Sequence, residues 1–470
     1  MAGYHVENFG CRASRADGEA IDVQLRQRGL TPADSTTADV IVVNTCSVTE
    51  QADRTARAFL RRVQRDNPRA RIVVTGCYAQ RAPREVAALR GVHAVVGNSH
   101  KALVPDLAAE AAGILPGAVS SGFVSIDALQ SIPNLWRGPS IHVDDIFAHS
   151  SLAAVPFAVA SLGQSALSQT RPNLKVQDGC GNKCSFCIIP STRGHSRSMP
   201  LETCLRSVET FVESGGKELV LSGINLGRWG RDLIPSATLE QLVSAILSRT
   251  SLERLRLSSV EPMDWTPELI ALFGTYGTSS NRRLARHAHL PLQSGSDATL
   301  RAMHRRYRPW HYAEKVATIR REMPDASIGA DVMVGFPGES EATFEESFAF
   351  IAAQPFTYLH LFPFSARPGT AAWSLHQRSP VPSRAVEERM GRLRDLIAGK
   401  NLRFRQSFLD RSLPVITLHT PESEVRQGLT RALTDNFLPV ELQGRFPANQ
   451  ALQVTISGLH EEGLAGHLAG

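Results

Sequence analysis

The first hundred residues alternate between short apolar runs and longer segments in which apolar residues recur every three or four positions. The apolar runs are YHVENFG, ADVIVVNTC and RIVVTGC, and a helical pattern follows the second run over residues 50–65. Short apolar runs predict buried strands, and the longer spacing predicts amphipathic helices. Strands that alternate with helices form parallel sheets. We therefore predict an N-terminal parallel α/β sheet domain over residues 1–112.

This periodicity is lost over residues 113–172. The stretches GILPGAVSSGF, SIPNLWRGPS and SLGQSALSQT are rich in Gly, Ser and Pro. Such composition is typical of loops and breaks regular elements. We predict a linker or an insertion here.

The β/α alternation resumes at residue 173 and predicts six further strands. These are LKVQ, KELVLSG, LRLSSV, HAHLPL, SIGADVMVGF and YLHLFPF, separated by helical segments such as LETCLRSVETFVES. A full barrel of eight βα units takes about 250 residues, so six units favour a partial barrel. With a trailing helix to about residue 408, this second domain covers residues 173–408.

The segment 409–470 differs from the rest of the chain. Short apolar runs such as LPVITLH and LQVTISG are broken by turn residues, which predicts a small all-β module. It contains four Lys or Arg and seven Asp or Glu, a balance of −3. Since the whole chain carries +6, the remainder carries +9, and this positive excess permits a polyanionic partner such as RNA.

The 470 residues contain no apolar run approaching the ~20 residues of a membrane-spanning helix. The first twenty residues, MAGYHVENFGCRASRADGEA, do not show the pattern of a secretory signal. We therefore expect a cytoplasmic protein without a membrane partner.

Seven cysteines form an odd, clustered set, which favours reduced thiols used as ligands over a disulfide framework. Cys11, Cys46 and Cys77 each stand close to the end of a predicted strand. Because parallel sheets bind ligands outside the carboxyl ends of their strands, we expect these three thiols to converge. Cys204 lies within a helical pattern and is expected to be a packed core residue.

The other three cysteines, Cys180, Cys184 and Cys187, form a CxxxCxxC motif in a loop after a predicted strand. Thiolates are preferred ligands for zinc, Cu(I) and iron–sulfur clusters. A structural zinc site needs a fourth ligand, and the nearest candidates, His195 and Cys204, are separated from the loop by a proline or lie in the next helix. A four-iron cluster on three cysteines leaves one iron open for a ligand. A zinc site and three unrelated buried cysteines remain alternatives.

The CxxxCxxC motif after the first strand of six βα units resembles the signature of radical S-adenosylmethionine enzymes. Within that superfamily the chain resembles methylthiotransferases, because seven blocks occur in their typical order: NFGC, VVNTCSVTEQADRTAR, VVTGCYAQ, VQDGCGNKCSFCIIPSTRG, HLPLQSGSDATLRAMHRRY, DVMVGFPGE and FPFSARPGT. The C-terminal TDNFLPV also resembles the small RNA-binding TRAM domain of these enzymes.

This resemblance implies two 4Fe–4S clusters and S-adenosylmethionine as cofactors. The auxiliary cluster would bind Cys11, Cys46 and Cys77, and the radical-generating cluster would bind Cys180, Cys184 and Cys187. One S-adenosylmethionine would methylate a sulfur at the auxiliary cluster. A second would be cleaved reductively to a radical that removes hydrogen from an unactivated carbon, where the methylthio group is then inserted.

Further cofactor contacts are expected near strand ends, where such residues concentrate in barrel enzymes. They are Ser222, Gly223, Asn225, Glu261, Gln293 and Asp331, joined by Arg193 after the cluster loop. An ordinary turn is the alternative for the Ser222–Asn225 segment, and a helix cap is the alternative for Glu261 and Gln293.

The family acts on three kinds of substrate, and its resemblance to this chain favours N6-threonylcarbamoyladenosine at position 37 of tRNA. Isopentenyladenosine 37 is the runner-up, followed by a ribosomal protein aspartate. We expect the anticodon loop of tRNA and an electron donor protein as partners.

Phosphate contacts are predicted from an arginine-rich region, although a solvated helix face explains this run of arginines equally well. Its members are Arg282, Arg283, Arg286, Arg301, Arg305, Arg306 and Arg308.

Two rival functions follow from the same residues. A non-catalytic RNA-binding protein stabilised by a metal would not need an open iron. A cobalamin-dependent radical enzyme would carry a DxHxxG pattern in its first domain, and the sequence lacks that pattern.

Overall fold

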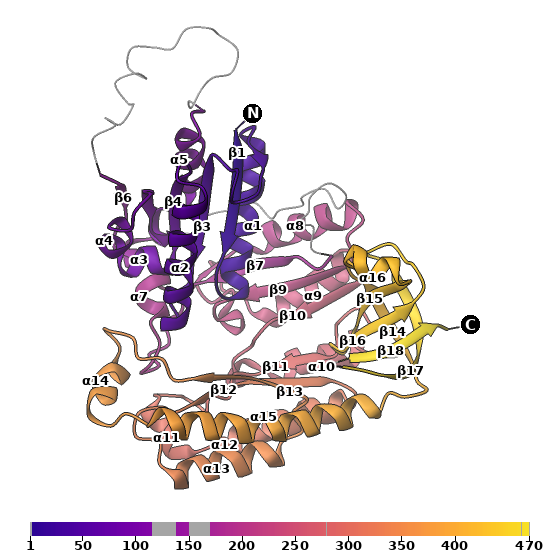
Figure 1. Ribbon diagram of the computed structural model, residues 1–470. Coiled ribbons are helices and arrows are strands. Elements are labelled where there is room, and N and C mark those ends of the chain that lie inside the picture. Colours follow the sequence, from indigo (N-terminus) through magenta and orange to yellow (C-terminus); the bar gives the residue numbers. More distant parts are fainter. Residues whose placement is uncertain (1, 115–137, 150–169, 279, 462, 470) are drawn as a thin grey trace. The chain divides into compact units, whose positions relative to one another are not determined.

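The computed structural model describes most of the chain (Figure 1). The described residues are 2–114, 138–149, 170–278, 280–461 and 463–469. They form two compact units. The first is 1–158 with 178–182 and 187–197, and the second is 159–177, 183–186 and 198–470.

The first unit contains a six-stranded sheet whose strands are all parallel, in the order β2-β1-β3-β4-β5-β6. The strands are β1 (Gly3–Asn8), β2 (Thr31–Pro32), β3 (Val40–Thr45), β4 (Arg71–Gly76), β5 (Val92–Val96) and β6 (Ser140–His142). This confirms the predicted N-terminal α/β sheet domain.

Helices cover both faces of this sheet, which explains why its central strand β3 is buried along its length. On one face, Ile41 and Val43 pack with α2 (Glu50–Asp66), α3 (Cys77–Arg81) and α4 (Pro83–Ala87). On the other face, Val40 and Val42 pack with α1 (Arg12–Gln27) and α5 (Val104–Ala111). A 3-10 turn, η1 (Asn98–Leu103), precedes α5.

Part of the segment expected to be a linker or an insertion belongs to the sheet. The edge strand β6 pairs with β5, and the short turn η2 (Ile146–Ala148) follows it. β6 has only three residues, too few to show an alternating pattern. The rest of the expected linker, 115–137 and 150–169, lies outside the described residues.

Strands of the predicted partial barrel form two sheets, in the orders β10-β9-β7-β8 and β11-β12-β13. A single bridge between Leu255 and Leu284 links them. The strands are β7 (Asn173–Asp178), β8 (Arg197–Ser198), β9 (Glu218–Gly223), β10 (Arg254–Leu257), β11 (His287–His289), β12 (Ser327–Val334) and β13 (Tyr358–Pro363). All six predicted strands are present, which confirms the fold class expected for this domain.

Helices connect these strands. They are α7 (Ile189–Arg193), α8 (Leu201–Glu213), α9 (Leu239–Arg249), α10 (Pro267–Tyr276), α11 (Asp297–Ala302), α12 (Pro309–Glu322), α13 (Glu341–Ala353), α14 (Ala371–Arg378) and α15 (Ser383–Gln406), with 3-10 turns η3 (Leu226–Arg228) and η4 (Pro262–Asp264). In Figure 1, α12, α13 and α15 lie together on the outer side of the β11-β12-β13 sheet. None of the helices in the described part of the chain is long and apolar enough to cross a membrane.

The C-terminal module is a small closed barrel, as predicted, with the strand order β14-β15-β16-β18-β17. Its strands are β14 (Ser412–Thr417), β15 (Leu429–Thr434), β16 (Pro439–Gln443), β17 (Ala451–His460) and β18 (Gly463–Leu468), and a short helix, α16 (Glu422–Arg426), follows β14. Phe408, just after α15, is part of the apolar core of this module.

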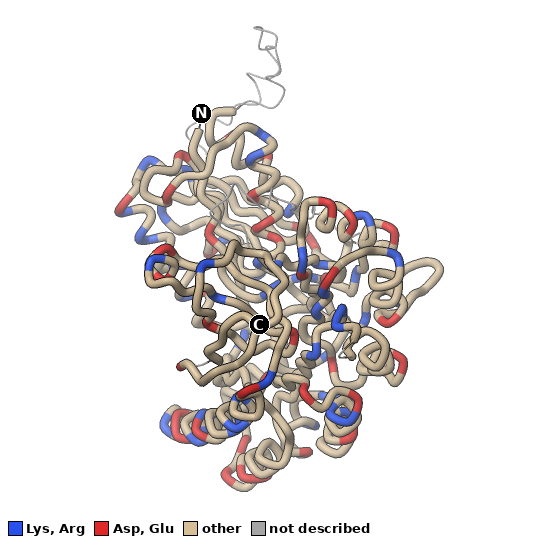
Figure 2. Tube along the Cα trace, turned by 90° about the vertical axis from the view of Figure 1, so that its right-hand side faces the viewer, with Lys and Arg blue, Asp and Glu red and all other residues tan. Residues whose placement is uncertain are grey.

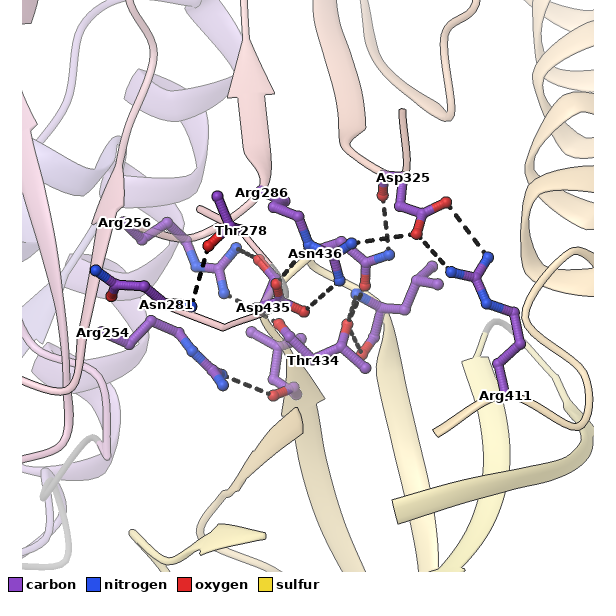
Figure 3. A network of polar contacts seen from close by, with 12 residues as sticks. Arg254, Arg256, Thr278, Asn281, Arg286, Asp325, Arg411, Thr434, Asp435 and Asn436 are labelled. Atoms are coloured by element: carbon purple, nitrogen blue, oxygen red, sulfur yellow. Dashed lines mark hydrogen bonds and ion pairs between the residues drawn. The ribbon is translucent and has the colours of Figure 1, made fainter. Parts of the chain in front are cut away.

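The turn between β15 and β16 docks this module against the first residues of the barrel strands (Figure 3). The Asp435 carboxylate accepts hydrogen bonds from Arg286 at 2.6 and 3.0 Å. The buried Arg256 guanidinium donates to the carbonyl oxygens of Thr434 and Asp435 at 3.1 and 3.0 Å. Arg254 donates to the carbonyl oxygen of Leu433 at 3.4 Å. The TDNF part of the TRAM-like motif is therefore used for contacts inside the chain.

Phe437, two residues after Asp435 in this turn, contacts side chains on the inner face of the barrel. Its ring lies 4.5 Å from His287 and 5.7 Å from Tyr358, measured between centroids, and the Arg256 guanidinium stands 5.3 Å from its centre. Because Arg256, His287 and Tyr358 belong to β10, β11 and β13, these strands present polar side chains to one common interior.

Candidate functional site

Three cysteines of the first unit follow the carboxyl ends of neighbouring strands, where the sequence predicted them to converge. Cys11 follows β1, Cys46 follows β3, and Cys77 follows β4 as the first residue of α3. The pKa of Cys46 is raised to about 12. Burial is the largest cause, and the thiols of Cys77 and Cys11 contribute to the same increase. Cys46 therefore interacts electrostatically with both other thiols. All three are free of disulfide bonds.

Glycines directly before two of these cysteines make the approach of the three loops feasible. Gly10 has φ of +115°, and a Cβ atom there would stand 2.4 Å from the Cβ of Cys46. Gly76 has φ of +97°, and a Cβ atom there would stand 2.2 Å from the carbonyl oxygen of Thr45. Both positions therefore exclude larger side chains. The Gly–Cys pairs are a signal in the sequence that our reasoning from strand ends did not use.

A buried arginine accompanies the three thiols. Arg193, 1% exposed, donates to both carboxylate oxygens of Asp178 at 2.9 and 3.0 Å and to Asp17 at 3.1 Å. Burial lowers its pKa, but Asp178, Cys77, Asp17 and Cys11 more than offset this effect and hold it above the usual value. Arg193 therefore stays charged and stabilises thiolates nearby. Its expected contact with a cofactor carboxylate stays a prediction.

Other polar groups hold the cysteine loops in place. Arg81, on the helix that begins with Cys77, donates to the Ser47 hydroxyl at 2.8 Å and to Asp53 at 3.0 Å. Asn98 donates to the Cys77 sulfur at 3.5 Å and to the Thr192 carbonyl oxygen at 2.8 Å. These bonds restrain the residues on either side of the thiols.

The residues of this group fit an iron–sulfur cluster. Three sulfur donors follow the ends of neighbouring strands, a permanently charged guanidinium interacts electrostatically with them, and Cys46 and Cys77 are buried. Crowded, buried thiols resist ionisation unless a cation shares the charge, which an iron–sulfur cluster does. We infer that Cys11, Cys46 and Cys77 would hold such a cluster.

The second cysteine group lies in the loop that follows β7. Cys180 accepts a hydrogen bond from the backbone N–H of Asn182 at 3.4 Å. In the second unit, Cys184 accepts from the Arg305 guanidinium at 3.3 Å, and Arg305 also donates to Glu261 at 2.5 Å. Burial lowers the pKa of Arg305, but Tyr307, Glu261 and Cys184 outweigh it, so the guanidinium stays charged beside the Cys184 sulfur. This arrangement suits a thiolate ligand.

Residues expected to contact the cofactor occupy the carboxyl ends of the barrel strands. Ser222 donates to the Leu174 carbonyl oxygen at 3.4 Å, and the backbone N–H of Asn225 donates to the Gln177 side chain at 2.7 Å. Gly223 leaves no room for a Cβ, which would stand 2.9 Å from the Gln177 side-chain oxygen. These contacts shape a close backbone turn, and cofactor binding by its residues stays a prediction.

Two buried oxygen atoms near this end of the barrel lack hydrogen-bond partners among the described residues. They are Oε1 of Gln293, whose φ is +66°, and Oγ of Ser258. A buried polar atom without a partner costs free energy, which a bound ligand that donates hydrogen bonds removes. The site therefore fits S-adenosylmethionine, which offers an amine, hydroxyls and an adenine amino group.

Asp331 belongs to a polar row that the sequence did not reveal. The carboxylate oxygen Oδ1 of Asp331 lies 3.1 Å from His289 Nε2 and 3.2 Å from His360 Nδ1. Burial raises the pKa of Asp331, but the two imidazoles outweigh it and keep it below the usual carboxyl value. Recognising this row requires the register that places Asp331 beside His360.

The arginines predicted to bind RNA differ in what they contact. Arg283 donates to the carbonyl oxygens of Leu247, Thr250 and Leu252, at 2.6 to 2.8 Å, near the end of α9. Burial lowers the pKa of the half-buried Arg282, whereas Arg306 is exposed. Figure 2 shows acidic residues interspersed with the basic ones along the chain. RNA contact by Arg282, Arg283, Arg305 and Arg306 stays a prediction.

Comparisons with known proteins extend these observations. The family described as "Uncharacterized protein family UPF0004" matches residues 3–97, and the Radical SAM superfamily matches residues 174–351. A "Threonylcarbamoyladenosine tRNA methylthiotransferase MtaB" of Aquifex aeolicus is 33% identical over 96% of this chain and 99% of its own length. A "tRNA-2-methylthio-N(6)-dimethylallyladenosine synthase" of Sphingopyxis alaskensis is 30% identical over 97% of this chain and 92% of its own length.

Among solved structures, a radical S-adenosylmethionine methyltransferase, TsrM from Kitasatospora setae with cobalamin and a 4Fe–4S cluster bound, matches with a TM-score of 0.55. It is 15% identical and covers 79% of this chain, which covers 77% of it. A likeness at this identity shows the fold alone.

Proposed function

The chain belongs to the radical S-adenosylmethionine methylthiotransferase family, and on this premise we propose that it modifies tRNA. The reaction we propose is insertion of a methylthio group at C2 of N6-threonylcarbamoyladenosine at position 37. Relatives named for this activity match over nearly the full chain, at 28 to 33% identity.

One observation carries the proposal: the chain has two separate groups of three cysteines, one at the ends of three neighbouring parallel strands and the other in the loop after β7. A single cluster or a zinc site would leave one group without a function. A cobalamin enzyme would not need the group formed by Cys11, Cys46 and Cys77. Two three-cysteine sites support a reaction that both supplies sulfur and cleaves S-adenosylmethionine.

When bound, the clusters and S-adenosylmethionine would supply the electron chemistry and the methylthio group. The protein's own residues would hold and orient them. Cys11, Cys46 and Cys77 would be the ligands for one cluster, and Arg193 keeps a positive charge near these sulfurs. Cys184 would be a ligand for the other, and Arg305, which also bonds Glu261, donates to its sulfur.

The partners we propose are the anticodon loop of tRNA and a separate electron donor protein. Base 37 is in a single-stranded loop, so it can enter a protein site without the melting of a long duplex. The net charge of +9 outside residues 409–470 supports contact with phosphates. Arg306 is an exposed candidate for such a contact.

The test is mass spectrometry of tRNA nucleosides from cells with and without the gene. Loss of the methylthio form of threonylcarbamoyladenosine, restored by the intact chain, is the expected result. A Cys46→Ala variant should not restore it. Cys204→Ala is the matched control, because Cys204 is also buried but lies on α8 and belongs to neither cysteine group.

The runner-up substrate is dimethylallyladenosine at the same position, since relatives named for that product match at up to 30% identity. Loss of its methylthio form, with the threonylcarbamoyl product unchanged, would establish this alternative. If neither nucleoside changes, a ribosomal protein aspartate becomes the substrate to examine.

A further inference from the structure

A row of polar side chains crosses the inner face of the β11-β12-β13 sheet. It runs from His289 on β11 through Asp331 on β12 to His360 on β13. The strand register places Asp331 beside His360, and residues on alternate positions, Ala330 and Val332, are buried on the outer face. Four residues or fewer separate this row from the first residues of the strands, where the C-terminal module docks.

One hydrogen bond and a set of close polar contacts hold this row. The Asp331 carboxylate accepts from His360 Nδ1–H at 3.2 Å, and His289 Nε2 lies 3.1 Å from the same oxygen without hydrogen-bond geometry. The Tyr358 hydroxyl lies 2.9 Å from His289 Nδ1 and 2.7 Å from His287 Nε2. With Nδ1–H bonded to Asp331, Nε2 is the acceptor nitrogen of His360 and stands at the end of the row.

Exposure increases along the row toward the open side of the barrel. The side chain of His289 is 4% exposed, that of Asp331 24% and that of His360 56%. β13 is the last strand of its sheet, and among the described residues no strand pairs with its outer edge. Nε2 of His360 also has no hydrogen-bond partner among those residues. His360 is thus the part of the row that an incoming molecule can reach.

We propose that His360 recognises the threonylcarbamoyl substituent of the substrate base by accepting a hydrogen bond from its hydroxyl group. This inference rests on the proposed function and assigns a specificity residue to it. Asp331 acts as a positioning residue, because its bond to Nδ1–H fixes the tautomer and the orientation of His360. A dimethylallyl substituent has no hydroxyl and would leave this nitrogen without a partner, so the row favours the polar substrate.

Two histidines and an aspartate also form a common ligand set for a divalent metal ion. The observations favour the hydrogen-bonded row, because His360 already bonds the Asp331 carboxylate at 3.2 Å, and the Tyr358 hydroxyl lies 2.9 Å from the second nitrogen of His289. Metal binding is therefore an outcome that the test must separate from substrate recognition.

The experiment uses the reconstituted full chain and two anticodon stem-loop RNAs that carry threonylcarbamoyl or dimethylallyl at base 37. Competition in one reaction gives the ratio of the two products, and dissociation constants are measured separately without turnover. We expect His360→Leu to reduce the preference for the threonylcarbamoyl RNA about tenfold. His360→Asn, whose amide oxygen accepts a hydrogen bond, should restore part of it, and His311→Leu on the exposed side of α12 should leave it unchanged.

Each outcome decides the inference separately from the proposed function. An unchanged preference in His360→Leu, or equal binding of both RNAs by the wild-type chain, overturns the role of His360. So does a stoichiometric divalent metal that is lost in His360→Leu. Tight, His360-dependent binding of the threonylcarbamoyl RNA without its modification would uphold the inference and reject the proposed function.

Discussion

Replacement of Asp435 by alanine should weaken the attachment of the C-terminal module more than any single change on its surface. Asp435 is fully buried and bonds Arg286 through both carboxylate oxygens. The Arg286 side chain is 11% exposed. After the change to alanine, the Asp325 carboxylate, 3.2 Å from the Arg286 guanidinium, is its remaining acidic partner among the described residues. Arg254 and Arg282 are also close enough to interact electrostatically with the lost carboxylate.

The expected loss follows from these contacts. Removing one partner of a buried ion pair costs about 3–5 kcal/mol, because the other charge is left without compensation. Asp325 retains part of the interaction with Arg286, which favours the lower end, about 3 kcal/mol. This corresponds to roughly a hundredfold increase in the fraction of undocked or unfolded module.

Limited proteolysis under native conditions measures this fraction, because cleavage follows the population of the open state when opening is fast. Glu424→Ala is the matched control, since the Glu424–Arg431 ion pair lies on the surface of the same module and contributes about 0–1 kcal/mol. If the two variants are cleaved at the same rate, the docking role of Asp435 is refuted.

The effect should also depend on pH. Burial raises the pKa of Asp435, but its bonds to Arg286 outweigh burial and lower it below the usual value. A lowered folded-state pKa means that the stabilisation is complete above about pH 4, the pKa of an unfolded aspartate, and is lost as the pH falls through the folded-state pKa. The difference between wild type and Asp435→Ala should therefore be full at pH 7 and shrink below pH 4.

Three further predictions concern the cysteine groups. Cys184→Ala should abolish cleavage of S-adenosylmethionine and modification, whereas Cys46→Ala should retain cleavage and lose methylthiolation; methylthiolation by Cys46→Ala would contradict two separate clusters. Gly10→Ala should lose about half of the bound iron, because the added Cβ atom would overlap Cys46. Gly29→Ala is the control: Gly29 also has a positive φ, +81°, but an added Cβ atom would have no neighbour within 4 Å, so this variant should retain its iron. Arg193→Met should lower the free energy of unfolding by about 3 kcal/mol, measured by urea denaturation, because the buried Asp178 loses its bidentate ion pair and Asp17 loses one cationic partner while Lys101 remains; a change below 1 kcal/mol would argue against that role.

The sequence was sufficient for features that repeat locally. Apolar runs predicted β1, β3 and β4 of the first sheet and six of the seven strands of the partial barrel, and Cys11, Cys46 and Cys77 were expected to converge because each follows a strand in a parallel sheet. The short strand β6 could not be predicted, since three residues carry no period and its partner β5 is more than forty positions away.

Partners distant in sequence explain what the sequence analysis missed at the site. A run of arginines between residues 282 and 308 looks like a phosphate-binding surface, but charge density does not say which guanidinium groups are already occupied. Arg305 bonds Cys184, which is 121 positions away, and Arg286 bonds Asp435, which is 149 positions away. The row of His289, Asp331 and His360 likewise depends on the register between strands, which no local pattern specifies.

The docking turn has a consequence for divergence among related chains. Three of its acceptors are main-chain carbonyl oxygens, those of Leu433, Thr434 and Asp435, and these persist through any substitution that keeps the turn. Other docking contacts depend on side chains: Asp435 bonds Arg286, Asn436 donates to the Asp325 carbonyl oxygen at 3.0 Å, and the Phe437 ring contacts His287. Homologues can therefore change single letters of the TDNF motif and keep the main-chain part of this docking contact, so an imperfect match to the motif does not exclude the same attachment of the module.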